Sequence, residues 1–507
     1  MKMDKRLCVI LLIVILTVAL RLYSADRFLI NDEITWITPA KNIVASGFPS
    51  NPIYCGVPGG YFYIHPPMGL ILYSTTIASA GVEFVRLVPI IFGLLSILLT
   101  YFLGKKLFDD RTALIAAGMM AISSYHIIAS QIIDVDGAIL AFFNLATILS
   151  FVLYKKNLQK RFLFFSGLFL ILSLFTKMSG FLVIIPILVY SYALDRNFRK
   201  TGKELIFFIV CGIIFLGALY GYASIAGQNG YFTEPVNYLM QFSGRGSSPS
   251  IQNVLLDKAF YVATASWQMT PFLLALLLLA LFKKNRDSNY WLLVSWILTI
   301  VIIFMMPYGG AFERYFTTVL PAVFIFIASF LSRINLNKKI IIPVMVISFL
   351  LAAIFGISDV LGYYNPLLIA AVYVVAFAML IPRKREQLLL GAFAGLSLFL
   401  VIGMATWPAV ESNLVKDITE GVDEFGFPHN ETYANQDIDF YLTPKDETPQ
   451  ICFPELTMDY MKNNNITYLA VYGFRDELKL KSLAQNCLEK REIFVSGRLA
   501  GLVCKLE

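Results

Sequence analysis

Long apolar runs constrain this chain more than any other feature. They recur from residue 7 to residue 407 and are separated by short polar connections. A helix of about 20 apolar residues spans the hydrocarbon core of a bilayer. The composition agrees, because 58% of the residues are hydrophobic and only 15% are charged, which is too apolar for an ordinary water-soluble chain. The sequence therefore predicts a polytopic α-helical membrane protein.

The runs predict about 13 transmembrane helices. The predicted spans are Leu7–Tyr23, Leu87–Gly104, Thr112–Ile127, Gln131–Tyr154, Phe162–Thr176, Met178–Leu194, Glu204–Ala226, Ala259–Phe282, Asn289–Pro307, Phe312–Leu331, Ile340–Ile357, Pro366–Pro382 and Leu388–Trp407. A further apolar stretch, His65–Ala80, would reach only about 24 Å across a core of about 30 Å. We predict that this stretch is interfacial or re-entrant.

Charge on the connections sets the predicted topology. If His65–Ala80 does not cross the membrane, every strongly basic connection lies on the same side as the basic N-terminus, as the positive-inside rule requires. These connections contain Lys105-Lys106, Lys155-Lys156, Arg199-Lys200, Lys283-Lys284, Lys338-Lys339 and Arg383-Lys384-Arg385. No convincing cleavage site follows the first run, so we expect a retained first span. The prediction is a plasma-membrane protein with a cytoplasmic N-terminus.

This topology divides the chain into a transmembrane module, residues 1–407, and a small soluble extracytoplasmic α/β domain, residues 408–507. The module carries two long external loops, residues 24–86 and 227–257. Alternation and helical periodicity predict the elements of the α/β domain. These are strands at Ile466–Val471 and Glu492–Lys505 and helices at Glu455–Asn463 and Lys479–Glu489.

Two details of the external segments carry structural predictions. In the first loop, Thr38-Pro39 predicts the start of a short helix over Pro39–Ser46. Four cysteines fall in segments placed outside, where a disulfide is permitted but not demanded. They are Cys55, Cys452, Cys487 and Cys504.

Acidic residues mark two places on the external face. Asp32 and Glu33 follow the first span, and Asp134 and Asp136 stand at the outer mouth of the fourth. Carboxylates at a bilayer surface are costly unless they meet water, a cation or a reacting group, so both places are candidate sites. Asp134 and Asp136 are suited to hold a divalent cation or substrate hydroxyls. The alternative is that these acids cap helix N-termini.

Two cations on the same face run against the positive-inside gradient. Lys177 lies between the fifth and sixth spans, and Arg314 begins the tenth. Such cations suggest an anionic ligand such as phosphate, and His65 is a candidate for the same ligand. The alternatives are a snorkelling anchor, an effect of the neighbouring Glu313, or a structural histidine. The loop 227–257 is either a mobile cover over the site or a passive connection.

Several classes of site have no sequence signal. The chain has no Walker or dinucleotide glycine loop, no basic patch typical of nucleic-acid binding, and no CxxC or Cys/His metal spacing. We therefore expect neither a nucleotide donor nor a nucleic-acid partner. The only cofactor to consider is the divalent cation at Asp134 and Asp136.

Taken in order, these motifs resemble the GT-C glycosyltransferases of the dolichyl-phosphate-mannose protein mannosyltransferase and aminoarabinose transferase type. The likeness covers roughly residues 1–330. The motifs that carry it are Asp32-Glu33, His65-Pro66-Pro67-Met68, Asp136 followed by an apolar helix, Lys177–Gly180, and Arg314-Tyr315 with the later Pro321. Two departures are His65, where many aminoarabinose transferases have lysine, and Asp134, which is not a fixed feature of these relatives.

The resemblance implies an external active site and an inverting transfer from a polyprenyl-phosphate sugar, with Asp32 as the base. We expect Asp32 and Glu33 to be catalytic, and the remaining candidates to bind substrate. The acceptor is a protein, a glycan or a lipid. One alternative is a secondary transporter or flippase for lipid-linked sugars, which predicts paired repeats and broken helices near the midplane. Another is a membrane scaffold without catalysis.

Overall fold

The computed structural model describes residues 14–15, 17–22, 27–29, 32–47, 49, 53–54, 65–225, 273–281, 286–304, 313–333, 343, 346–347, 350, 407–427, 432–434, 450–451, 467–472, 477–495 and 498–506. The predicted loop 227–257 and the helix Glu455–Asn463 lie outside these residues. The three predicted spans between residues 340 and 407 lie wholly or largely outside them.

The chain forms two compact units. The first comprises Met1–Tyr23, Tyr63–Gly69 and Leu87–Ala405, and the second comprises Ser24–Phe62, Leu70–Arg86 and Thr406–Glu507. The second unit thus joins most of the first predicted loop to the C-terminal region. The membrane-based boundary at residue 408 stays a prediction.

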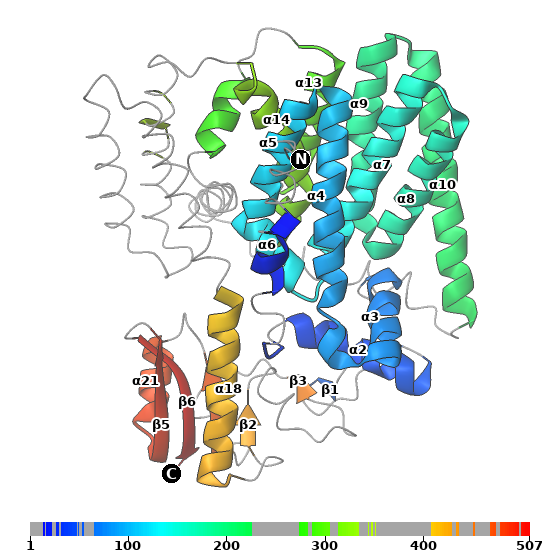
Figure 1. Ribbon diagram of the computed structural model, residues 1–507. Helices are drawn as coiled ribbons and strands as arrows, with labels where there is room; N and C mark the ends of the chain where they lie inside the picture. Colours follow the sequence, from blue (N-terminus) through cyan, green and yellow to red (C-terminus); the bar gives the residue numbers. More distant parts are fainter. Residues whose placement is uncertain are drawn as a thin grey trace, which may run out of the picture. The chain divides into compact units, whose positions relative to one another are not determined.

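The first unit is helical (Figure 1). Its elements are α4 (Leu87–Leu107), α5 (Asp110–Ile122), α6 (Ser124–Gln131), α7 (Ala138–Asn157), α8 (Lys160–Thr176), η2 (Met178–Val183), α9 (Ile184–Asp195), α10 (Phe198–Ile225), α13 (Ser288–Phe304), η3 (Glu313–Val319) and α14 (Leu320–Leu331). Among the described residues, four helices are long and apolar enough to cross a membrane, or five if α5 and α6 form one bent span. The predicted helical membrane fold is confirmed.

Four predicted spans differ in detail, and two of them, Met178–Leu194 and Phe312–Leu331, begin as the 3-10 helices η2 and η3. Thr112–Ile127 is not one helix, because the chain bends by 60° between α5 and α6. The span predicted from Gln131 begins only at Ala138, because Asp134 turns the intervening backbone with its own carboxylate. Both interruptions have a polar signal in the sequence: Ser123-Ser124 lies at the first, and Asp134, Asp136 and Gly137 lie at the second.

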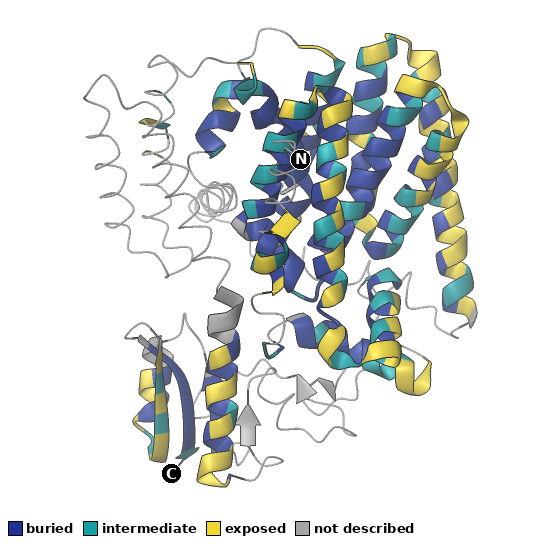
Figure 2. Cartoon of the chain, in the orientation of Figure 1, coloured by how far each residue is buried: buried dark blue, intermediate teal, exposed yellow. Residues whose placement is uncertain are grey.

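Helix α7 forms the centre of the first unit and packs against α4 and α8. Most of its residues are buried, whereas α10 exposes large apolar side chains such as Ile206 and Ile213 (Figure 2). Hydrogen bonds between helices join α7 to α8: Ser173 Oγ donates to Asn144 Oδ1 at 2.6 Å, and Ser166 Oγ donates to the Thr147 carbonyl at 3.0 Å. Such polar contacts hold helices together where lipid weakens the hydrophobic effect.

The second unit contains α2 (Asp32–Ser46), β1 (Ile53–Tyr54), most of α3 (Met68–Ala80), η1 (Val82–Phe84), α18 (Trp407–Phe425), β2 (Thr432–Ala434), β3 (Gln450–Ile451), β4 (Tyr468–Tyr472), α21 (Glu477–Ala484), β5 (Cys487–Val495) and β6 (Arg498–Leu506). Its main sheet has the strand order β2-β4-β6-β5, with β2 parallel to β4 and the other pairs antiparallel. Strands β1 and β3 form a separate parallel pair.

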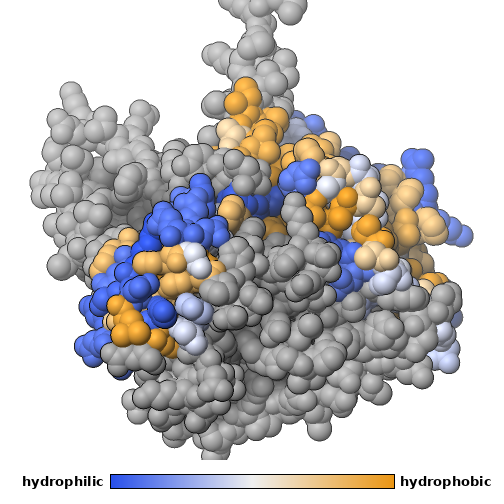
Figure 3. All heavy atoms as spheres, turned by 90° about the horizontal axis from the view of Figure 1, so that it is seen from below, coloured by the Kyte–Doolittle hydropathy of each residue, from blue (hydrophilic) through white to orange (hydrophobic). Residues whose placement is uncertain are grey.

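The sheet separates two apolar clusters. Leu414, Ile418 and Val422 of α18 pack with Ala470, while α21 packs with Leu469 and its strand neighbours. Residues 469 and 470 enter different clusters because successive strand residues point to opposite faces. Seen from below, the described surface carries hydrophilic patches between hydrophobic ones (Figure 3).

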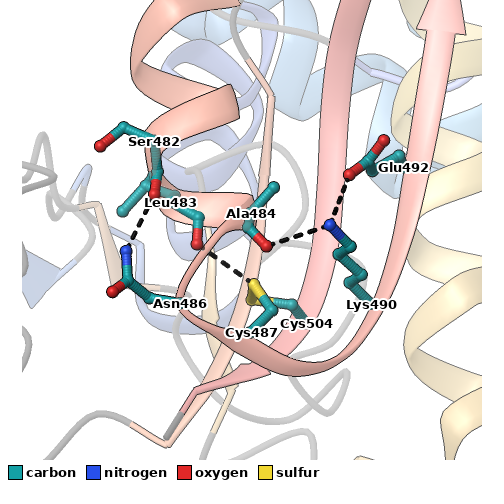
Figure 4. The surroundings of a disulfide bond; sticks show 8 residues. All are labelled: Ser482, Leu483, Ala484, Asn486, Cys487, Lys490, Glu492 and Cys504. Atoms are coloured by element: carbon teal, nitrogen blue, oxygen red, sulfur yellow. Dashed lines mark hydrogen bonds and ion pairs between the residues drawn. A yellow bond between two sulfur atoms is a disulfide. The ribbon is translucent and has the colours of Figure 1, made fainter.

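The predicted C-terminal mixture of helix and strand is confirmed, with corrected boundaries. The run Glu492–Lys505 belongs to two strands, β5 and β6, and the helix predicted to reach Glu489 ends at Ala484. Helix α18 was not predicted. A disulfide joins Cys487 of β5 to Cys504 of β6 (Figure 4). Cys55 and Cys452 lie outside the described residues.

The helix predicted over Pro39–Ser46 begins earlier, at Asp32, so that Pro39 lies inside it. Proline disfavours a helix interior because it lacks an N–H donor. Here packing overrides that preference: Ile34, Trp36 and Ile37 are at most 3% exposed, and the Trp36 ring meets the edge of Tyr73 of α3 at 6.4 Å. The proline signal alone was therefore misleading.

Candidate active site

Glu33 lies in the first turn of α2 and is fully buried. Arg27 contacts both carboxylate oxygens, with Nη1–Oε2 at 2.7 Å and Nη2–Oε1 at 2.9 Å. Arg86 Nη2 lies 2.8 Å from Oε2. Burial by itself would raise the pKa of Glu33, but the two guanidiniums hold that pKa below its usual value. Glu33 is therefore an ionised carboxylate with both oxygens already engaged.

The same guanidiniums also hold the backbone that leads into α2. Arg86 donates from Nη1 to the Arg27 carbonyl at 2.5 Å and from Nη2 to the Phe28 carbonyl at 2.9 Å. Asp32, the predicted base, is the first residue of this helix. Its side chain lies outside the described part of the chain, so the structure places Asp32 by its backbone alone.

Asp134 and Asp136 lie in the turn between α6 and α7, and both are buried. Asp134 Oδ1 accepts hydrogen bonds from the backbone N–H groups of Val135, at 2.5 Å, and Asp136, at 3.0 Å. This carboxylate thus builds the turn, which is close to the capping alternative considered for it. Asp136 instead contacts a cation, because its Oδ1 lies 2.5 Å from Lys177 Nζ.

Lys177 follows the last residue of α8 and precedes η2. Gly180 N–H donates to the Lys177 carbonyl at 2.9 Å, which closes a tight turn. A Cβ atom on Gly180 would lie 2.9 Å from the carbonyl carbon of Ser173 and 3.0 Å from its oxygen. The Lys-x-x-Gly motif therefore has a steric basis, since only glycine lets this turn pack on the end of α8.

The two remaining candidates, His65 and Arg314, have fewer described contacts than Asp136 and Lys177. His65 is half-buried and precedes the buried Pro66 and Pro67 at the start of α3. Arg314 lies in η3, where its backbone is described and its side chain is not. Among the candidates, the structure thus brings together Asp136 and Lys177.

The donor set for a divalent cation is incomplete in the described part of the chain. No group of three or more His, Cys, Asp or Glu residues is suited to hold a metal there. One oxygen of Asp136 already contacts an ammonium group, and one oxygen of Asp134 already accepts two backbone hydrogen bonds. These two residues do not fit a cation site by themselves, and the metal stays a prediction.

Sequence reasoning missed several buried charges. Arg27 and Arg86 lie on the predicted external side. The positive-inside argument that singled out Lys177 therefore applies to them as well. Arg21, fully buried, donates to the Ala121 carbonyl at 3.2 Å, and its Nη2 lies 2.7 Å from Nδ1 of the equally buried His126. An arginine inside a predicted span is itself the signal that was overlooked.

Structural similarity to known proteins extends over most of the chain. Residues 64–221 match the family described as dolichyl-phosphate-mannose-protein mannosyltransferase. Among solved structures, ArnT from Cupriavidus metallidurans in the apo state has a TM-score of 0.59 at 14% identity, over 97% of each chain. ArnT bound to undecaprenyl phosphate gives 0.59 at 15% identity, again over 97% of each chain. The chain has the GT-C fold.

The GT-C resemblance drawn from the motifs is thereby confirmed. The apo oligosaccharyltransferase of Archaeoglobus fulgidus also shares the GT-C fold, with a TM-score of 0.53 at 16% identity over 94% of this chain and 70% of the other. A comparison with curated protein sequences found no match. The family match contains His65, Asp134, Asp136 and Lys177, whereas Asp32 lies outside the matched residues.

Proposed function

We propose that this chain is a membrane glycosyltransferase that moves a sugar from a polyprenyl-phosphate carrier to an acceptor hydroxyl, with inversion, on the extracytoplasmic face. The observation that carries the proposal is the joint match: a mannosyltransferase family over residues 64–221, and the fold of ArnT over 97% of the chain. The ArnT structure bound to undecaprenyl phosphate supports the class of donor. The family description favours a hexosyl donor, whose first candidate is mannosyl phosphate on a dolichyl-type carrier.

In the proposed reaction, Asp32 accepts the proton of the acceptor hydroxyl as its oxygen attacks the anomeric carbon of the sugar. The bond from that carbon to the phosphate oxygen breaks, and the carrier phosphate leaves with the electron pair. Because phosphate is a stable leaving group, the protein needs to supply positive charge more than an acid. Lys177, Arg314 and His65 are the proposed donors of that stabilisation.

The described contacts refine two of the roles. Asp136 fixes the position of Lys177 by pairing with it, so its proposed role is to orient that ammonium as well as sugar hydroxyls. Glu33 is engaged by two arginines and supports Asp32 from the next position along α2. Asp32 is thus the proposed catalytic base and Glu33 a positioning residue.

The test uses membranes that contain the full chain and a panel of labelled polyprenyl-phosphate sugars. We expect one label to move to an acceptor with the native chain and not with Asp32→Asn, which nearly preserves the shape of the side chain. Asp417→Asn, an exposed acid of α18, is the matched control and should transfer normally. Full transfer by Asp32→Asn removes Asp32 from the mechanism, and no transfer of any label by the native chain removes the proposal.

One observation favours a second candidate, a flippase for lipid-linked sugars. The bend of 60° between α5 and α6 resembles the broken helices of transporters, and it adjoins the buried Arg21 and His126. A flippase moves the intact donor between leaflets in sealed vesicles without cleaving it. Asp32→Asn should leave that movement unchanged, which separates the two functions.

A further inference from the structure

The segment Arg27–Leu29 is held by the C-terminal region as well as by Arg86. The Phe28 N–H donates to Ser412 Oγ of α18 at 2.7 Å, across 384 residues of sequence. The Phe28 ring packs against the apolar cluster that α18 forms with the sheet, which includes Leu414 and Val415. Both the backbone and the side chain of Phe28 therefore contact α18 or the cluster that it forms.

The anchor on α18 is itself rigid. Ser412 is only 3% exposed, and Leu414, Val415, Ile418 and Val422 are at most 1% exposed. These residues pack with Ala470 of β4 and Val503 of β6, so the position of Ser412 is fixed by a sheet core. Close-packed protein interiors are hardly compressible, so a shift of one buried residue displaces its neighbours.

The tethered segment connects directly to the proposed base. Asp32 begins α2 only three residues after Leu29, and Glu33 in the same turn is bound by Arg27 and Arg86. Arg86 also donates to the Phe28 carbonyl. The C=O of Phe28 therefore binds Arg86 and its N–H binds Ser412. The start of α2 is consequently fixed on both sides of Asp32.

A second connection joins the two parts of the unit. Strand β1 of the first loop pairs in parallel with β3 of the C-terminal region, with Ile53 opposite Gln450 and Tyr54 opposite Ile451. The C-terminal region thus contacts the first loop both before and after α2.

We infer that the C-terminal region is a brace that positions Asp32 for proton transfer, with Ser412 and Phe28 as its contact. This inference rests on the proposed function. It gives the region a role within the catalytic step, because displacing a catalytic group by about 1 Å lowers rates by about 100-fold. Ser412 acts through the backbone of Phe28 and is a positioning residue.

The decisive variant is Ser412→Ala, which removes the Ser412 hydroxyl that accepts from the half-buried Phe28 N–H. We expect kcat to fall at least about tenfold while KM for the labelled donor changes less than about twofold, since the variant alters geometry and not donor contacts. Thr419→Ala is the control, because among the described residues Thr419 donates a hydrogen bond within α18, to the Val415 carbonyl. Ser412→Thr retains the hydroxyl and should restore most of kcat. Unchanged kcat in Ser412→Ala overturns the brace.

Hydrogen exchange gives a readout that does not need activity. In Ser412→Ala, peptides covering residues 27–40 should exchange faster while β4 and β6 remain protected. Faster exchange throughout the unit would mean general destabilisation and overturns the inference, as does unchanged exchange at residues 27–40. If the native chain moves no labelled sugar, the proposed function fails, and local exchange still decides whether α18 holds this segment.

Discussion

Lys177 Nζ lies 2.5 Å from Asp136 Oδ1, which joins the turn after α8 to the turn before α7. Lys177 was predicted to bind phosphate and Asp136 to bind a sugar or a cation, so the sequence suggested separate roles for them. The Asp136 side chain is 3% exposed and that of Lys177 14%. At this burial the two charges depend on each other, because either one alone would be poorly solvated.

This dependence predicts how neutralising variants behave. Asp136→Asn or Lys177→Met alone should lower the free energy of unfolding by about 3–5 kcal/mol, the usual cost of leaving one charge of a buried pair uncompensated. The double variant should recover much of that stability. It should not recover sugar transfer, which on the proposed mechanism needs the Lys177 charge.

Thermal unfolding in detergent and transfer assays in membranes measure the two effects. Lys105 and Asp110, an exposed ion pair at 2.8 Å, give the matched control, since neutralising either should change stability by less than about 1 kcal/mol. Additive losses in the double variant would show that Asp136 and Lys177 do not interact.

The turn that carries Lys177 makes a second prediction. Gly180→Ala would bring a methyl group within 3.0 Å of backbone atoms of Ser173, so the turn has to move. We expect lower stability and a large loss of transfer, because Lys177 moves with the turn. Gly212→Ala is the control: a Cβ atom there meets nothing within 4 Å, and alanine favours a helix more than glycine does. Equal behaviour of the two variants in thermal unfolding and transfer would contradict the steric explanation.

Local patterns predicted the spans α4, α7, α9 and α10 and the C-terminal mixture of helix and strand. Pairing between distant residues was not predictable in the same way. Glu33 meets Arg86 across 53 residues of sequence, and no periodicity encodes that contact. Helix α18 was predictable from Leu414, Ile418 and Val422, which recur at helical spacing among exposed charges, but it directly follows an apolar run that was assigned as a span.

Glu33 should make stability depend on pH with a definite sign. Its pKa is lowered in the folded state by Arg27 and Arg86, so the ionised form stabilises the fold above the unfolded pKa, about 4.3. That contribution is lost as the pH falls through the lower, folded pKa. The native chain should therefore be more stable than Glu33→Gln at pH 7.

The difference between the two chains should narrow below about pH 4.3, as Glu33 takes up a proton and comes to resemble glutamine. Thermal unfolding of both chains in detergent between pH 3 and pH 7 measures the change. Glu420→Gln on the exposed face of α18 is the control and should track the native chain throughout. A difference that stays constant down to pH 3 would mean that the guanidiniums do not lower the pKa of Glu33 in the folded state.

The register of β1 and β3 predicts a further covalent link. Ile53 pairs with Gln450 and Tyr54 with Ile451, and the next residues in sequence are Cys55 and Cys452. Each cysteine thus directly follows, in the sequence, a residue of the β1–β3 pair, and we predict that the two are joined. Both thiols would lose a proton and an electron to a disulfide oxidant on the side of the membrane that the sequence predicts to be extracytoplasmic. We expect peptide mapping of unreduced protein to recover Cys55 linked to Cys452.

The chain supplies both controls for that mapping. Cys487 and Cys504 are joined and should appear as a linked pair, and buried Cys211 is free and should appear as a thiol. Closing so long a loop restricts the unfolded chain, so Cys55→Ser should lower the free energy of unfolding by about 2–4 kcal/mol. It should also speed hydrogen exchange around α2, since the link would join the first loop to the C-terminal region. Recovery of Cys55 and Cys452 as free thiols beside an intact Cys487–Cys504 pair would contradict the predicted link.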